Sequence, residues 1–137
     1  MNSSHSESRK IRIAAAIIAD ASGRLLLVRK RGTSAFMQPG GKIEPDEEPV
    51  DALVRELHEE LGLLIEPGAA SRLGLFSAQA ANEPDCTVEA ELFSLSIDSE
   101  PIPAAEIEEM IWLDPDLANG IELAPLTRDV VPALRGK

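Results

Sequence analysis

The stretch that most constrains the fold of this chain covers residues 40–63, GGKIEPDEEPVDALVRELHEELGL. Its apolar residues recur every three or four positions, which predicts an amphipathic helix with one side packed in a core. These apolar residues are Val50, Leu53, Val54, Leu57 and Leu61. We expect Asp46 to cap the first free N–H groups of the helix, Pro49 to be tolerated in its first turn, and Gly62 to end it.

The same helix carries a second, acidic side. Glu56, Glu59 and Glu60 are spaced three and four residues apart, which places them on one face. Like charges at these spacings repel by roughly 0.2–0.5 kcal/mol per pair, so a divalent cation is the simplest missing partner. An acidic helix without a ligand is the alternative. It leaves unexplained the adjoining Gly40 and Gly41, which let the backbone approach a ligand closely.

The rest of the chain predicts a mixed α/β protein. Apolar runs at 11–20 and 24–30 flank a turn at 21–23 and predict a hairpin. Further strands are expected at 63–65, 72–79, 87–97 and 109–113, with a polar turn at 81–85, a short helix near 114–118, and a helix at 125–135 interrupted at Pro132. Because both faces of such a sheet need covering, we expect an α/β/α sandwich around a mixed β-sheet.

Length and charge restrict the classes of partner. The 137 residues predict a flexible leader over 1–10 and one domain over 11–137. A net charge of −11 argues against a nucleic-acid partner, although a small phosphorylated ligand screened by metal ions is compatible with it. The polar leader lacks the apolar run of a signal peptide and no stretch is long enough to span a membrane, so we expect a cytoplasmic protein without a membrane partner.

The central stretch resembles the signature of the Nudix hydrolases, the Nudix box. Gly41 is followed after five residues by Glu47, and after seven more by the run RELHEELGL at residues 55–63. All defined positions of that signature are filled, and the preceding FMQPGGK resembles the same family. The resemblance implies a Nudix fold and a hydrolase that cleaves a phosphoanhydride bond of a nucleoside diphosphate linked to a further group. It also implies a requirement for Mg²⁺, with Mn²⁺ as a substitute.

The resemblance assigns roles to particular residues. Glu56, Glu59 and Glu60 would be metal ligands, together with a backbone carbonyl of Gly40 or Gly41. Glu60 is the first choice among these metal ligands, and Glu59, Glu60 and Glu106 are the candidate catalytic residues. The general base would be Glu106, in the loop before Trp112, with Glu100 as a substitute; alternatively, Glu59 would act as the base. Glu47 and Arg55 would form a structural ion pair rather than take part in the chemistry.

Substrate contacts are less constrained by the sequence. The basic cluster that begins at Arg29 is either a solvated strand end or a phosphate contact. Lys42 is either a phosphate contact or solvated, and Phe36 either flanks a nucleobase or packs in the core. The partner would be a small nucleotide, and homodimers are common among proteins of this resemblance.

The substrate itself is assigned by what the chain lacks. Features that mark several Nudix subgroups are absent, which favours a MutT-like enzyme that converts a nucleoside triphosphate to a monophosphate and pyrophosphate. The alternative is a catalytically silent Nudix domain that binds a nucleotide as a sensor. Silent members usually lose carboxylates of the box, whereas all of them are present here.

Overall fold

The computed structural model of the chain describes residues 9–80, 85–117 and 120–134. Its strands are β1 (Arg9–Ile18), β2 (Leu25–Lys30), β3 (Gly40–Lys42), β4 (Ser71–Gln79), β5 (Cys86–Leu95) and β6 (Ile107–Leu113). Its helices are α1 (Pro49–Leu61) and α2 (Pro125–Leu134), with short 3-10 helices η1 (Pro67–Ala69) and η2 (Pro115–Leu117). Most of the predicted leader, the turn at 81–84, and the ends predicted at residues 118 and 135 lie outside the described residues.

Strand β1 lies inside a four-stranded mixed sheet with the order β3-β1-β5-β4. It pairs in parallel with β5 and antiparallel with β3, and β4 pairs antiparallel with β5. Strands β2 and β6 form a separate antiparallel pair. The second half of β1, from Ile13 to Ile18, is continuously apolar because its side chains pack on both faces of the sheet, whereas Arg9, Lys10 and Arg12 in its first half are exposed.

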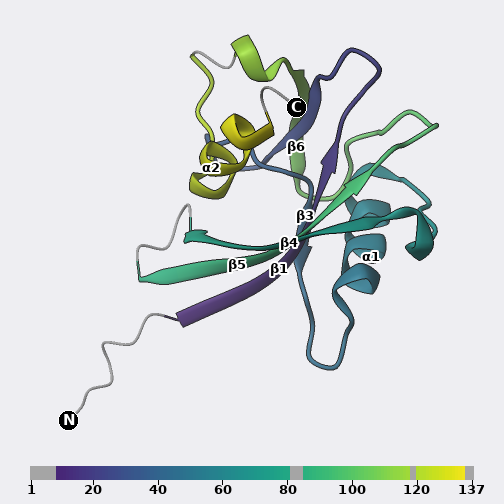
Figure 1. Ribbon diagram of the computed structural model, residues 1–137, viewed down its shortest axis with the longest axis vertical. Coiled ribbons are helices and arrows are strands. Elements are labelled where there is room, and N and C mark those ends of the chain that lie inside the picture. The colour runs from purple at the N-terminus through teal and green to yellow at the C-terminus, as the bar shows by residue number, and fades with distance from the viewer. Residues whose placement is uncertain (1–8, 81–84, 118–119, 135–137) are drawn as a thin grey trace.

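Alternate residues of β1 face the two helices. Ala14 and Ala16 pack with Leu53 and Leu57 of α1, whereas Ala15 packs in a second cluster that includes α2. The small alanine side chains allow α1 to approach the sheet closely. Figure 1 shows the two helices on opposite sides of the strands. The predicted α/β fold with a mixed sheet between helices is therefore confirmed.

The predicted hairpin of the first two strands is wrong. Strands β1 and β2 belong to different sheets and are connected by one isolated bridge, between Ala19 and Leu25. The turn itself is present, because the Asp20 carboxylate accepts hydrogen bonds from the backbone N–H groups of Ser22 and Arg24, both at 2.9 Å. The local turn was readable from sequence, but the strand pairing beyond it is decided by distant segments.

Several predicted boundaries also need correction. Asp46 is not the N-cap: it lies in a turn with φ of 66°, and Glu48 precedes the helix without a side-chain capping bond. Gly62 does end α1, in the left-handed conformation with φ of 68°. Residues 63–65 form no strand, and α2 continues through Pro132 to Leu134 instead of breaking there. Strand β3 was missed, because its glycines are poor strand formers.

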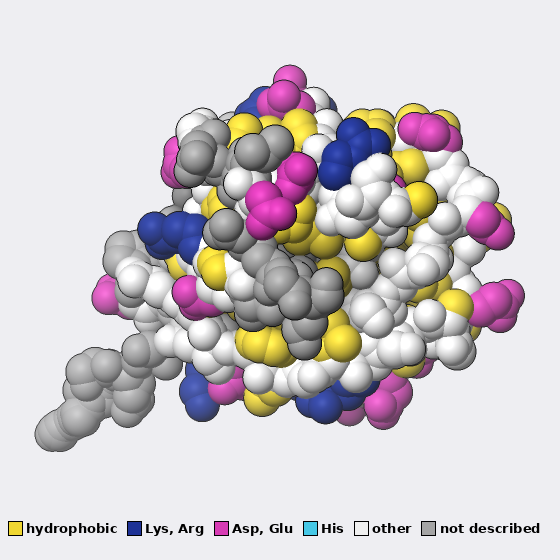
Figure 2. Space-filling model, turned by 45° about the horizontal axis from the view of Figure 1, so that its top comes forward, with side chains coloured by type: hydrophobic (Ala, Val, Ile, Leu, Met, Phe, Trp, Pro, Cys, Tyr) yellow, Lys and Arg dark blue, Asp and Glu magenta, His cyan; other side chains and the backbone are white. Residues whose placement is uncertain are grey.

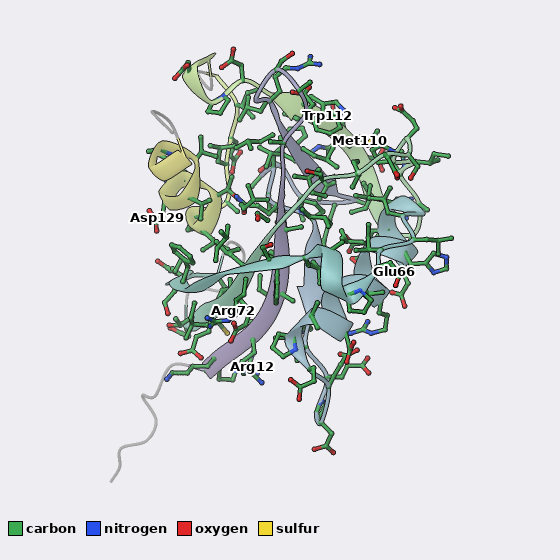
Figure 3. All side chains as sticks on the ribbon, turned by 45° about the vertical axis from the view of Figure 1, so that its right-hand side comes forward. Arg12, Glu66, Arg72, Met110, Trp112 and Asp129 are labelled. Atoms are coloured by element: carbon green, nitrogen blue, oxygen red, sulfur yellow. The ribbon has the colours of Figure 1, made fainter. Side chains whose placement is uncertain are left out.

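The main core lies between the sheet, α1 and the β2–β6 pair. Leu26 and Val28 of β2 contribute to it from within, and Met110 and Trp112 of β6, labelled in Figure 3, pack against it. Trp112 is partly buried and packs against this core. This packing fixes α1 against β1 and β3, and so fixes the acidic side of the helix against the glycine pair.

The surface reflects the acidic composition of the chain. On the face shown in Figure 2, Asp and Glu side chains are dispersed among isolated Lys and Arg side chains. Among the described residues, no helix is long and apolar enough to cross a bilayer.

Candidate active site

Glu60, in the last turn of α1, is the most unusual acidic side chain of the described structure. Its side chain is buried, with only 3% of the residue exposed. Its Oε1 atom has no hydrogen-bond partner among the described residues. The pKa of this carboxyl is raised to about 8, mainly by burial and also by the negative charges of Glu56 and Glu106, although Lys30 and a backbone hydrogen bond from Gly40 oppose the shift.

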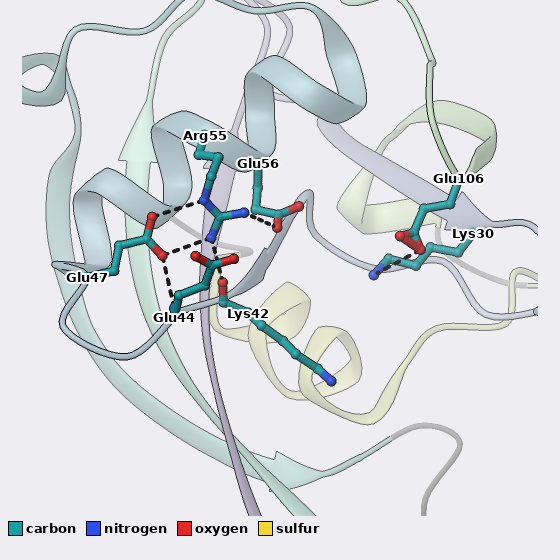
Figure 4. A network of polar contacts seen from close by, with 7 residues as sticks. All are labelled: Lys30, Lys42, Glu44, Glu47, Arg55, Glu56 and Glu106. Atoms are coloured by element: carbon teal, nitrogen blue, oxygen red, sulfur yellow. Dashed lines mark hydrogen bonds and ion pairs between the residues drawn. The ribbon is translucent and has the colours of Figure 1, made fainter.

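The groups that act on Glu60 come from four parts of the chain. Glu56 lies one turn earlier on α1, Gly40 begins β3, Lys30 ends β2, and Glu106 precedes β6. The Lys30 ammonium lies 3.9 Å from the Glu106 carboxylate, at the right of Figure 4. The structure therefore brings Glu106, proposed from sequence as a base, near enough to Glu60 for its charge to act on that carboxyl.

Arg55 connects the helix to the loop that precedes it (Figure 4). Its guanidinium donates two hydrogen bonds to Glu47, at 3.0 and 2.9 Å, one to the Glu56 carboxylate at 2.9 Å and one to the Lys42 carbonyl at 3.0 Å. Glu47 in turn accepts from the backbone N–H of Glu44 at 2.9 Å. The bonds from Arg55 and Glu44 lower the pKa of Glu47 to about 2, and the pKa of Arg55 is raised. Glu47 and Arg55 thus form an ion pair that positions Glu56.

Both residues of the glycine pair occupy places where a side chain does not fit. Gly40 has φ of 147°, and a Cβ atom there would overlap the backbone of Ala14 and Ala15 in the neighbouring strand. A Cβ on Gly41 would overlap the carboxylate of Glu56. The glycines therefore allow β3 to pair with β1 while the carboxylates of α1 lie directly against the backbone.

These features fit a hard divalent cation. Such ions take carboxylate and carbonyl oxygens, and the buried Oε1 of Glu60 is an oxygen donor without a partner beside further carboxylates. Within residues 9–80, 85–117 and 120–134, no three acidic, His or Cys side chains yet converge closely enough to enclose an ion. The reason is visible in the geometry: Glu56 is bonded to Arg55, and Glu59 is exposed on the helix surface.

Two of the predicted substrate contacts, Lys42 and Arg29, have different surroundings. Lys42 is exposed, and Figure 4 shows its ammonium pointing away from Arg55. Arg29 is occupied elsewhere, because it pairs with Glu109 at 3.0 Å and donates to the Thr33 carbonyl at 2.8 Å.

The structure also shows the surroundings of Lys30, Phe36 and Glu100. Lys30, the neighbour of Arg29 in the basic cluster, is the residue of that cluster that acts on Glu60. Phe36 is buried against Leu27 and Leu113, so it packs in the core rather than flanking a nucleobase. Glu100, the substitute base, is exposed and is not among the charges that act on Glu60.

The sequence did not reveal one buried pair of polar side chains, Gln38 and Thr127. Thr127 of α2 donates a hydrogen bond from its hydroxyl to the Gln38 side-chain oxygen at 2.8 Å, and both residues are buried. They are 89 positions apart, so no local pattern connects them. The only sequence signal was a polar residue, Gln38, directly before the Pro39 and glycine turn.

Comparison with known families places nearly the whole chain in one of them. The NUDIX domain family matches residues 9–134. The match covers both sheets, both helices and every candidate site residue named above.

Individual relatives agree with this assignment. An RNA pyrophosphohydrolase of Halorhodospira halophila is 47% identical over 47 residues, covering 34% of this chain and 26% of that protein. An m7GpppN-mRNA hydrolase of Bos taurus is 28% identical over 136 residues, covering 84% of this chain and 45% of that protein. The chain thus matches less than half the length of either curated relative. The MutT protein of Methanosarcina mazei has the same fold, with a TM-score of 0.78, 24% identity and coverage of 93% and 94%.

Proposed function

The chain belongs to the Nudix hydrolase family, and on that premise we propose that it hydrolyses a nucleoside triphosphate to a nucleoside monophosphate and pyrophosphate. In this reaction the oxygen of water forms a new bond to phosphorus. One P–O bond of the phosphoanhydride breaks, and a proton leaves the attacking water. We further propose that the reaction depends on Mg²⁺, with Mn²⁺ as a substitute.

One observation carries this proposal: the buried carboxylate of Glu60 has an unpartnered oxygen, and the charges of Lys30, Glu56 and Glu106 act on it. A carboxylate in such a place is costly to the fold unless a cation balances it. Buried structural carboxylates are normally paired, so this arrangement supports a site that holds a cation together with a phosphate group.

The residues of the site would have different roles in this reaction. Glu56, Glu59 and Glu60, with a carbonyl of Gly40 or Gly41, would hold the metal. A bound divalent ion supplies charge neutralisation at phosphate oxygens and lowers the pKa of bound water. Arg55 and Glu47 fix the orientation of Glu56. Lys30 supplies a positive charge beside the carboxylates, where phosphate oxygens would lie.

Glu106 is our preferred general base. It precedes β6, acts on Glu60, and has an exposed side chain that a water molecule can reach. Glu59 is the alternative, because it is also exposed and lies on the acidic side of α1. Replacing the true base by glutamine removes a proton acceptor, which costs about 10²- to 10⁴-fold in rate, so Glu106→Gln and Glu59→Gln distinguish the two.

The test is to incubate the protein with Mg²⁺ and a panel of nucleoside triphosphates, dinucleoside polyphosphates and nucleotide sugars, and to identify the products. We expect monophosphate and pyrophosphate, with kcat reduced on the order of 100-fold or more in Glu60→Gln. Glu66→Gln, at an exposed glutamate beyond the end of α1, is the matched control and should retain activity. If no compound is hydrolysed, or if Glu60→Gln remains fully active, the catalytic proposal is wrong.

Two other functions remain as outcomes of this test. A silent domain would bind nucleotide without turnover, which a binding measurement on the same protein reveals. One curated relative is named as an RNA pyrophosphohydrolase and another as an m7GpppN-mRNA hydrolase, which suggests a second enzyme function, hydrolysis of a phosphoanhydride bond in an RNA. The two substrates differ in size and charge, and that difference provides a test given below.

A further inference from the structure

A second feature of the structure lies on the opposite face of the sheet from α1. A cavity of about 90 Å³ opens between β1, β5 and the beginning of α2. Its lining is mainly apolar and includes Ile13, Ala15, Val88, Ala124 and Leu126. A single water molecule requires about 10–15 Å³ of such space, so the cavity has room for a larger group. Its walls suit a flat, largely apolar one.

One polar group in this cavity is without a partner. Gln38 is 6% exposed, and its side-chain Nε2 has no hydrogen-bond partner within the described part of the chain. Its other end is fixed, because Oε1 accepts the hydrogen bond from Thr127, which is fully buried. Both residues line the cavity. A buried N–H₂ group left unbonded is costly, so the site is complete only when a hydrogen-bond acceptor enters the cavity.

The cavity lies close to the acidic site. Gln38 precedes Gly40 by two residues, and two residues of extended chain span at most about 7 Å. Gly40 contacts Glu60 through its backbone and pairs with Ala15, which lines the cavity. One ligand can therefore place phosphates near Glu60 and a flat ring beside Gln38.

Building on the proposed function, we propose that Gln38 reads the base of the nucleotide. Thr127 holds the carboxamide oxygen, so the N–H₂ group points its donors at the ligand. The matching ligand is a base with a carbonyl oxygen at that position, as in hypoxanthine and guanine. Adenine carries an amino group there and presents a donor to a donor. The enzyme should therefore prefer bases with this carbonyl over adenine.

Inosine and adenosine nucleotides form the sharpest pair for a test, because their bases differ at this carbonyl and the adjacent ring nitrogen. We expect kcat/KM for inosine triphosphate to exceed that for adenosine triphosphate by about 10- to 100-fold. Gln38→Met, which keeps the length of the side chain without donors, should bring the two within about 3-fold. Thr127→Val should weaken the preference in the same direction, because Gln38 loses its anchor. Thr87→Val, on β5 and outside the cavity lining, is the matched control.

Binding provides a readout independent of turnover. Calorimetry with the monophosphates of inosine and adenosine, without added metal, should show the same order of affinities, and Gln38→Met should abolish the difference. If triphosphates are hydrolysed but kcat/KM and affinity are the same for inosine and adenosine nucleotides, this proposal is overturned and the hydrolase function stands. If inosine monophosphate binds more tightly without any hydrolysis, base reading stands and the hydrolase proposal fails. Preference for adenine would overturn the assigned orientation of the carboxamide.

Discussion

Burial of the Glu60 carboxyl makes the stability of the metal-free fold depend on pH. Its pKa in the folded protein is raised to about 8, mainly by burial, whereas in the unfolded chain it has the ordinary value of 4.5. Below the ordinary value both states hold the proton and nothing is lost. As pH rises towards the folded value, the unfolded chain ionises while the folded chain keeps its proton, so metal-free stability falls across this window.

We predict that Glu60→Gln stabilises the metal-free protein increasingly from about pH 5 to about pH 8, by about 1–3 kcal/mol at the upper end. The amide resembles the protonated carboxyl but does not titrate. Urea unfolding in the presence of a chelator at several pH values measures this, with Glu66→Gln as the control that should follow the unmodified protein. Added Mg²⁺ should stabilise the unmodified protein and not the variant. A stability difference that does not change with pH would contradict the prediction.

At the scale of elements, Arg55 joins three segments: α1, the Lys42 carbonyl of β3 and the loop that contains Glu47. The planar guanidinium makes these bonds simultaneously, whereas lysine offers a point charge without this fork. We predict that Arg55→Lys lowers kcat about 10- to 100-fold, because Glu56 is no longer held, while stability changes by about 1 kcal/mol or less. Enzyme kinetics beside thermal unfolding tests this. Arg24→Lys alters another arginine–carboxylate pair, to Asp20, and should leave kcat unchanged.

The Glu47 side of this connection predicts a pH effect of the opposite sign. The pKa of Glu47 is lowered to about 2 by Arg55 and by the backbone N–H of Glu44. The stabilisation from this pair is therefore present above the ordinary pKa and is lost as pH falls towards the folded value. The free energy of unfolding, measured as a function of pH, should be larger for the unmodified protein than for Glu47→Gln near neutral pH. This difference should disappear in strong acid. A difference that persists or grows in strong acid would show that the pair does not titrate as described.

How much of this could be read from sequence depends on the range of the interaction. Helix α1 was predicted to its last residue, because periodicity and the Gly62 stop are local signals. Asp46 was misplaced as the cap, because a turn with positive φ precedes the helix and no sequence pattern distinguished the two. The β1–β2 hairpin failed because β3 and β5, distant in sequence, take both edges of β1.

The site shows the same division. The box residues and the Glu47–Arg55 contact follow from a motif, and the metal-binding and catalytic roles assigned to them stay predictions. Lys30 and Arg29 are neighbours in sequence, but strand alternation sends them to different partners, Glu106 and Glu109. The Gln38–Thr127 bond joins an early turn to the final helix, so only the assembled fold reveals it.

At the scale of the whole molecule, the net charge of −11 favours a mononucleotide over an RNA end as the substrate. Each added nucleotide brings one more negative charge towards an acidic surface, and the face in Figure 2 carries only isolated basic side chains. An RNA-binding protein would instead show affinity that falls as salt rises, because bound phosphates release counterions from the nucleic acid. Repulsion predicts the reverse trend, since salt screens it.

We therefore predict that kcat/KM at low ionic strength is highest for the nucleoside triphosphate and declines when the same triphosphate heads an RNA of about two and then about ten nucleotides. Raising the salt from about 0.02 to about 0.2 M should reduce the difference in kcat/KM between these substrates, because the shorter Debye length screens the repulsion between RNA phosphates and the acidic surface. A triphosphate-capped DNA of equal length is the control for charge alone and should behave alike. If the longer RNA is the better substrate and loses that advantage as salt rises, the mononucleotide prediction is wrong and RNA is the substrate. The surface where the RNA phosphates leave the site would then be basic rather than acidic.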